Sequence, residues 1–183
     1  MYPLEARRPV IKLAFFVFVI SFCSGAHAAT GTLTAQTVVD TSCTVTTTGL
    51  TFGAYDPIVA HAASALDNGN TASVNITCIK GTTATIALGN GNFYVSPSGP
   101  RRMQNTGKAS VFLNYELYKP PSNLPGTACA FPGATPWNSS NTLVAPSAPN
   151  KNSRTFNVCG TVPAAQDVEV GTYSDTVMVT VSF

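Results

Sequence analysis

The residues of this 183-residue chain with the clearest chemistry are its cysteines. Cys23 lies in a leader-like segment, and the remaining four are Cys43, Cys78, Cys129 and Cys159. An even number of cysteines in an exported chain predicts two disulfides, for which three connectivities are possible. We favour sequential pairing, first with second and third with fourth, because each pair then joins the edges of a strand-loop-strand unit. A four-cysteine metal site is the alternative, and the absence of any C-x-x-C spacing disfavours it.

Side chains suited to acid–base or nucleophilic catalysis are few. His27 falls in the leader, so His61 is the single histidine of the mature chain. Its alanine-rich surroundings indicate a surface loop, and no G-x-S-x-G or comparable nucleophile context occurs. The carboxylates are scattered in turns or beside strands; they are Asp40, Asp56, Asp67, Glu116, Asp167, Glu169 and Asp175. We therefore expect neither enzymatic activity nor a cofactor. A small hydrolase remains an alternative, because a carboxylate pair forms in space rather than in sequence.

Three local motifs have weaker chemistry. Gly89-Asn90-Gly91 begins like a phosphate-binding loop, but Tyr94 replaces the third glycine and no helix follows, so we expect a turn. Arg101 and Arg102 with Lys108 form a small basic spot, which we interpret as a solvated strand edge. The proline-rich stretch from 120 to 152 predicts a long loop. Trp137 within it is expected to plug one end of the core, and stacking on a sugar in a carbohydrate-binding module is the alternative.

Residues 1–28 are expected to be a signal peptide. Arg7, Arg8 and Lys12 precede the apolar run 13–22, and Ala26-His27-Ala28 has the small-x-small pattern of a cleavage site. The run is shorter than the roughly 20 residues that span a bilayer, so we expect export without membrane insertion. Lipid attachment at Cys23 is disfavoured because a bulky phenylalanine precedes it.

The charge of the mature chain argues against two classes of partner. Cleavage removes three basic side chains and Glu5, which leaves seven basic against seven acidic residues. A neutral chain this poor in charge has no electrostatic footprint for nucleic acid or for an anionic membrane. It also repels its own copies only weakly, which suits a protein that assembles.

Apolar alternation and turn residues dominate the mature chain. Short strands are expected at 74–78, 85–88, 111–117, 156–159 and 173–183, separated by Gly/Asn/Pro/Ser tracts. In the third of these, Val111, Leu113, Tyr115 and Leu117 share one face. No window has a sustained helical period. Many short strands with Gly/Pro turns favour an all-β sandwich in one domain.

The two ends of the mature chain have the strongest bearing on function. Residues 30–40 alternate like a half-buried strand with no partner in its own domain, and their inward set is Leu33, Ala35, Thr37 and Val39. The closing strand, 171–183, alternates in the same way, with Val177, Val179, Val181 and Phe183 on one face. A domain flanked by a loose strand and a terminal strand is suited to exchanging strands with neighbours.

Several segments of the mature chain resemble the spore coat U domain, which is found in the subunits of archaic, Csu-type chaperone–usher pili. They are Cys43-Thr44-Val45, the stretch 50–57, Val74 to Cys78, Arg102-Met103, Leu113 to Tyr118, Trp137 and the ending 171–183. The resemblance covers essentially the whole mature chain. The Cys129 and Cys159 pair is a departure from it.

This resemblance implies an incomplete immunoglobulin-like sandwich that lacks its last strand and is completed by donor-strand exchange. Residues 29–41 would be the donor strand and 42–183 the pilin domain, and the closing strand would border the groove. The implied partners are a periplasmic chaperone, an outer-membrane usher and other pilus subunits, at the cell surface. The expected function is that of a fibre subunit for surface attachment and biofilm formation. A secreted spore or outer-coat protein of the same family is the alternative.

Overall fold

The computed structural model describes residues 28–63, 67–96 and 99–183, and the expected signal peptide up to residue 27 lies outside them. In these residues nine strands form two sheets, and no helix is assigned. Consequently no described helix has the length and hydropathy to cross a membrane. The strands are β1 (Cys43–Thr47), β2 (Asn68–Cys78), β3 (Thr85–Leu88), β4 (Arg101–Asn105), β5 (Lys108–Tyr118), β6 (Leu143–Val144), β7 (Arg154–Val162), β8 (Tyr173–Ser174) and β9 (Val179–Ser182). The expected all-β fold is confirmed.

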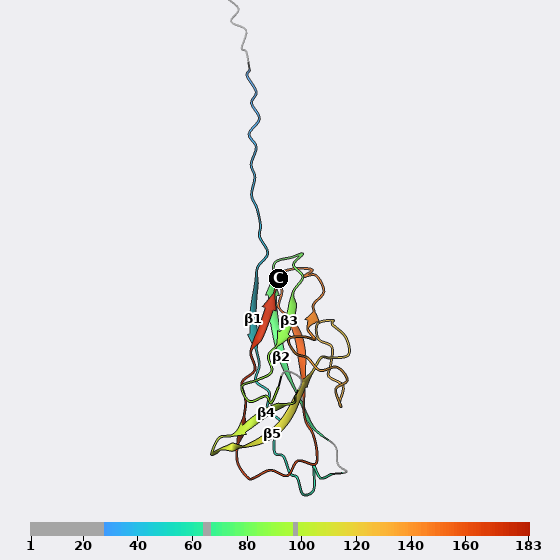
Figure 1. Ribbon diagram of the computed structural model, residues 1–183. Coiled ribbons are helices and arrows are strands. Elements are labelled where there is room, and N and C mark those ends of the chain that lie inside the picture. The colour runs from blue at the N-terminus through green and yellow to red at the C-terminus, as the bar shows by residue number, and fades with distance from the viewer. Residues whose placement is uncertain (1–27, 64–66, 97–98) are drawn as a thin grey trace, which may run out of the picture. The chain divides into compact units, whose positions relative to one another are not determined.

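The two sheets are antiparallel and differ in size. The larger has the order β1-β2-β7-β5-β4-β8, and the smaller has the order β6-β3-β9 (Figure 1). The C-terminus lies at the same end of the domain as the start of β1, because Cys43 pairs with Cys78 and Thr85 pairs with Ser182. We call this end the proximal pole and the opposite end the distal pole.

The core is formed by alternate residues of the long strands. On β2 every second side chain from Ala72 to Cys78 is buried, and on β5 the same holds for Leu113, Tyr115 and Leu117. These faces meet Ile86 of the small sheet in one apolar cluster. Alternation therefore located the inner faces of these strands correctly, although β2 begins six residues earlier than expected.

The closing segment is not one continuous strand. Tyr173 and Ser174 pair with β4 in the large sheet, whereas Val179 to Ser182 pair with β3 in the small sheet. Between them the chain crosses from one sheet to the other. The side chains keep one alternation throughout, with every second residue from Tyr173 to Val181 half-buried. For this reason the sequence pattern did not reveal the crossing.

The basic spot at Arg101 was misinterpreted, because this arginine is a core residue. Its side chain is 3% exposed and forms an ion pair with Glu116. Its guanidinium also donates to the carbonyls of Gly89 and Trp137. Arg102, with its guanidinium over the Phe112 ring, and the exposed Lys108 fit the expected edge. A buried cation is tolerated here because its donors are satisfied by acceptors from three other segments.

The long loop is held by Trp137 and a disulfide. Trp137 is 0% exposed, so the expectation of a core plug is confirmed and surface stacking on a sugar is ruled out for this side chain. Cys129 is bonded to Cys159 of β7, with a Cα–Cα distance of 5.5 Å. The other disulfide joins Cys43 to Cys78 across paired strands.

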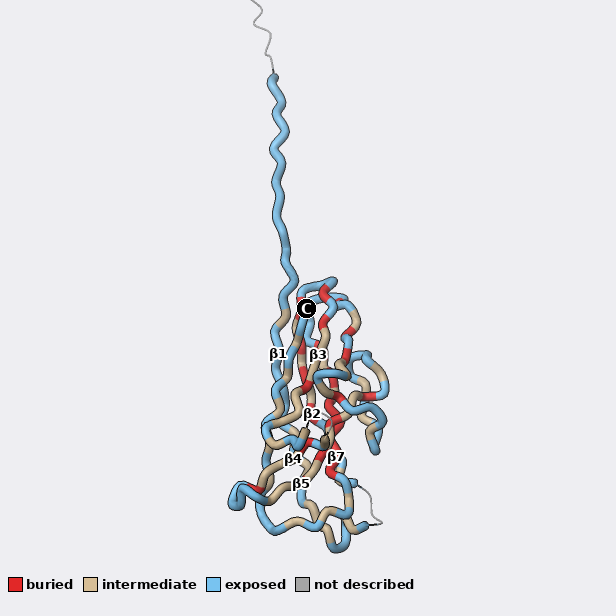
Figure 2. Tube along the Cα trace, in the orientation of Figure 1, coloured by how far each residue is buried: buried red, intermediate tan, exposed pale blue. Residues whose placement is uncertain are grey.

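The chain divides into two units after Val38. Residues 28–42 have no assigned strand, and all of them are exposed (Figure 2). Leu33 is 97% exposed and Val39 is 71% exposed. Apolar side chains at strand spacing are thus available for contacts outside the chain itself.

Candidate functional site

Two of the edge strands, β1 and β9, flank the same groove, and no described strand pairs with their outer edges. β1 ends the large sheet and is paired only with β2, while β9 ends the small sheet and is paired only with β3. On β1, Val45 is 44% exposed although it shares a face with the inward Cys43. An inward face that is still exposed indicates that the sandwich is open between these strands.

The main chain of β9 presents hydrogen-bonding groups to this opening. The amide of Gly89 donates to the carbonyl of Met178 at 2.8 Å, so Met178 faces β3. Main-chain groups of successive residues alternate between the two sides of an antiparallel strand. The N–H and C=O groups of Val177, Val179 and Val181 therefore point toward the groove side, where another strand can bind them.

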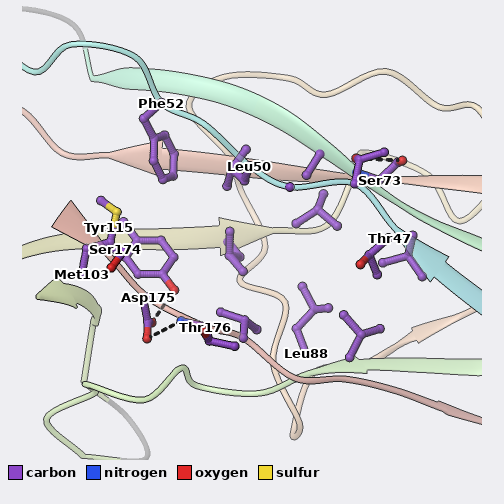
Figure 3. Close-up of a pocket in the computed structure, with 18 of the residues that line it drawn as sticks. Thr47, Leu50, Phe52, Ser73, Leu88, Met103, Tyr115, Ser174, Asp175 and Thr176 are labelled. Carbon is purple, nitrogen blue, oxygen red and sulfur yellow. Dashed lines mark hydrogen bonds between the residues drawn. The ribbon is translucent and has the colours of Figure 1, made fainter. Parts of the chain in front are cut away.

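The floor of the groove is apolar and contains a cavity of about 370 Å³. Val177 and Val179 of the closing segment line the cavity together with Thr47 and Leu50 and with buried core residues. Those core residues include Ala72, Val74, Leu88, Leu117 and Val158. Figure 3 shows Leu50 and Phe52 across the cavity from Asp175 and Thr176. A cavity that reaches the core leaves apolar surface in water, which is unfavourable and marks a binding site.

A second cavity, of about 740 Å³, continues the groove toward the distal pole. It shares Leu50, Phe52 and Met103 with the first cavity, and its far end is lined by Val168 and Glu169. The two cavities together follow the closing segment from Glu169 to Val179. This length is suited to an extended strand rather than to a compact small molecule.

One polar contact lies at the side of the first cavity. The Tyr115 hydroxyl donates to the Asp175 carboxylate at 2.6 Å (Figure 3), and Asp175 also accepts from the amide of Asn92 at 2.8 Å. Asp175 thus holds the closing segment against the turn at Gly91, where an added Cβ would lie 1.9 Å from its carboxylate. These contacts fix the segment where it crosses between the sheets.

The Tyr115 contact gives a pH-dependent prediction. Burial raises the pKa of Tyr115 above its ordinary 10.0, and the hydrogen bond to Asp175 raises it further. Below pH 10 the Tyr115 phenol is protonated in both the folded and the unfolded chain, so its full contribution to stability is present. Above pH 10 only the unfolded chain ionises, so the free energy of unfolding should fall by about 1.4 kcal/mol per pH unit. Urea unfolding between pH 8 and pH 11 measures this slope, and Tyr115→Phe should reduce it by that amount. Equal slopes for the two proteins would contradict the prediction.

The other free edge of the small sheet is covered. Asn123 donates through its side-chain amide to the carbonyl of Val144 in β6, and Lys119 donates to Thr142 and Asn141. The Val144 acceptor of this edge is thereby occupied, and Lys119 ties down the residues just before β6. Covered edges resist further strand pairing, so β9 is the better acceptor of a new strand.

The expected site residues lie as follows. Val177, Val179 and Val181 are half-buried and pack against the core beside the groove, whereas Phe183 is 54% exposed. Leu33, Ala35, Thr37 and Val39 are exposed in the N-terminal segment. Sequence reasoning missed the opposite wall, which includes Thr47, Leu50 and Phe52. The apolar residues of this wall are too few and too irregularly spaced to show the alternation of a β-strand.

Two of the scattered carboxylates, Asp56 and Asp67, accept hydrogen bonds from backbone amides. Asp56 accepts from the amides of Ile58 and Val59, which lowers the pKa of its carboxyl, and Asp67 accepts from Ala164. His61 accepts from the amide of Asp56 through Nδ1 at 3.0 Å. The Asp56 contacts are those of a turn at Asp-Pro, whereas a turn at Asp67-Asn68-Gly69 is not formed, because Asn68 and Gly69 begin β2 and Asp67 bonds to a distant loop. Among the described residues, no group of three or more His, Cys, Asp or Glu could hold a metal ion.

Fold and groove together define a β-sandwich protein with an open apolar groove between β1 and β9. Residues 29–180 match the Spore Coat Protein U domain, and the chain belongs to this family. It is 34% identical to Protein U of Myxococcus xanthus over 144 residues, which cover 73% of this chain and 71% of the relative.

A solved structure has the same fold. It is the pre-assembly complex of the chaperone CsuC with the tip adhesion subunit CsuE, from the archaic chaperone–usher Csu pili of Acinetobacter baumannii. The TM-score is 0.53 at 22% identity, and the match covers 79% of this chain but only 40% of that chain.

Proposed function

We propose that this protein is an exported structural subunit of a chaperone–usher fibre, which polymerises by donating a strand to a neighbouring copy. The observation that carries the proposal is the groove between the free edges of β1 and β9, whose floor is the hydrophobic core. Addition of a strand to an exposed edge supplies main-chain hydrogen bonds for affinity and side-chain pockets for specificity.

The donor is residues 30–40 of another copy. Leu33, Ala35, Thr37 and Val39 enter the groove, and the intervening residues face outward. Four alternate residues span about 20 Å at 3.3–3.4 Å per residue. Alternate residues of the closing segment that line the two cavities, from Tyr173 to Val179, span the same distance. Full burial of a leucine or valine stabilises by about 1.5–3 kcal/mol, so Leu33 and Val39 are the main anchors, while Ala35 and Thr37 add less.

The proposed partners before assembly are a periplasmic chaperone and an outer-membrane usher. The structural neighbour is itself described as a complex of a chaperone with a pilus subunit, which supports this route. A temporary partner is needed physically, because an apolar groove left in water promotes aggregation. The assembled fibre would lie on the cell surface and support attachment and biofilm formation.

A spore or outer-coat protein is the second candidate. The family name and the resemblance to Protein U favour it. Both candidates use the same groove, and they differ in whether copies form a long fibre. Genes for a chaperone and an usher next to this gene would favour the fibre.

A competing peptide tests the donor. A synthetic peptide of residues 29–42, added in excess to chaperone-bound full-length subunits, should cap the grooves and yield monomers and short oligomers in place of long polymers. Its control is the same peptide with Leu33→Asp and Val39→Asp, which would place charges in an apolar groove. The distribution of polymer lengths, measured by gel filtration and electron microscopy, is the readout. Equal inhibition by both peptides, or by neither, would count against the proposal.

A further inference from the structure

The linker between the donor segment of one subunit and that subunit's own domain is very short. The carbonyl of Ser42 accepts the amide of Ile79 at 3.0 Å, so Ser42 already belongs to the domain. Only Asp40 and Thr41 separate it from Val39, the last donor side chain. Three Cα–Cα steps span at most about 11 Å. If Val39 occupies a neighbour's groove, the end of that groove lies within about this distance of Ser42.

The symmetry of a fibre decides which end of the groove this is. Ser42, Ile79 and the start of β1 lie at the proximal pole. If the donor left the neighbour's groove at its proximal pole, two identical surfaces would face each other, and such contacts close into dimers. An open polymer needs two different surfaces. The donor therefore leaves at the distal pole, where the second cavity ends at Glu169.

We infer that the proximal pole of each subunit packs directly against the distal pole of the next, as a second interface beside the donated strand. This inference rests on the proposed function. The two poles carry apolar side chains that a solitary domain would leave in water. At the distal pole Ile58 is 82% exposed and Val170 is 98% exposed. At the proximal pole Ile79 and Phe183 are exposed.

The exposed charges of the two poles are complementary. The distal pole is acidic: Asp67, Asp167 and Glu169 are exposed there, and only Glu169 has an ion-pair partner, Lys108, within the described residues. That these loops form one pole follows from hydrogen bonds that join Asp67 to Ala164 and Thr106 to Thr172.

The proximal pole carries two exposed lysines. Lys80 follows Ile79, and Lys151 lies in the turn before β7, which is joined to the same pole by the hydrogen bond from Gly81 to Ala148. Neither lysine has an ion-pair partner within the described residues. The linker's own Asp40 adds one acid beside them. Opposite charges at facing poles set the rotation of one subunit on the next and favour head-to-tail over head-to-head encounters.

Zero-length crosslinking of assembled full-length fibres tests this interface. A carbodiimide joins an amine to a carboxylate only in direct contact, so mass spectrometry should find Lys80 or Lys151 joined to Asp67, Asp167 or Glu169 of a neighbour. The same products should be missing from chaperone-bound monomers. Lys119, which is held within the long loop, is the internal control and should form no such link.

Charge reversal gives a second readout. Replacing both proximal lysines (Lys80→Glu with Lys151→Glu) should make fibres dissociate roughly two- to tenfold faster on heating, as expected for the loss of two ion pairs at the rim. Asp167→Lys added to this variant should restore part of the loss. Fibres that depend on residues 30–40 but show neither crosslinks nor rescue would overturn the interface alone. Fibres that form without residues 30–40 would instead overturn the proposed function.

Discussion

Deletion of residues 30–40 is expected to abolish polymerisation while leaving the domain folded and able to bind its chaperone. The reason is topological, because every groove contact lies within 43–183 and the deleted residues include the entire donor set. The measurement is gel filtration and electron microscopy of material co-purified with the chaperone. A monomeric chaperone complex is expected, and polymers that persist after the deletion would refute donor exchange.

Two point variants test whether side chains of residues 30–40 pack into the groove, rather than whether this segment is merely present. Leu33→Asp places a carboxylate in an apolar cavity and should weaken subunit contacts by several kcal/mol, because it removes buried area and desolvates a charge. Thr34→Asp introduces the same charge on the outward face and should have little effect. Thermal dissociation of the fibres compares the two. Equal weakening by both variants would show that residues 33 and 34 are not distinguished by a groove.

Much of the fold was predictable because side-chain alternation reports which face of a strand is buried. β5 illustrates this, since Leu113, Tyr115 and Leu117 were assigned to one face and are all buried. Alternation does not report which sheet a strand joins. The closing segment keeps its period from Tyr173 to Val181 while its backbone moves from β4 to β3. Pairing depends on residues 68 to 97 positions away, and no local pattern contains them.

Strands β1 and β4 were missed for a related reason. β1 has four exposed residues and a single paired edge, so burial leaves no alternation in its sequence. β4 begins with an arginine whose burial depends on Glu116 and on carbonyls from distant segments. From sequence alone a charged residue is assigned to the surface, because the distant partners that would allow its burial are not known.

The groove could be predicted only in part, since it is defined by a strand that the domain does not have. Its valines were identifiable from the terminal alternation. Its opposite wall, which includes Leu50 and Phe52, belongs to a segment without regular structure. The resemblance to a family predicted a sandwich that lacks one strand. In the structure, the free edges of β1 and β9 are where that strand is missing.

Trp137→Ala is expected to destabilise the domain by about 3–5 kcal/mol, the usual range for loss of a buried tryptophan. This is a large share of the 5–15 kcal/mol by which a typical domain is stable. The side chain is fully buried, and its Nε1 donates to the carbonyl of Ile86 at 2.9 Å. Its own amide donates to Leu117 and its carbonyl accepts from Arg101. The residue thus joins the long loop to β3 of the small sheet and to β5 of the large sheet.

Trp137→Phe isolates the hydrogen bond from the packing. Phenylalanine retains most of the apolar volume but leaves the Ile86 carbonyl unpaired, so a smaller cost of about 1–3 kcal/mol is expected. Urea unfolding of chaperone-free subunits capped with the donor peptide measures both variants. Because β3 is the strand that carries β9, the alanine variant should also bind the donor peptide more weakly, and the phenylalanine variant should bind it nearly normally. Wild-type stability in the alanine variant would mean that Trp137 does not stabilise the core. A loss of stability without a loss of peptide binding would show that the long loop and the β9 edge are energetically independent.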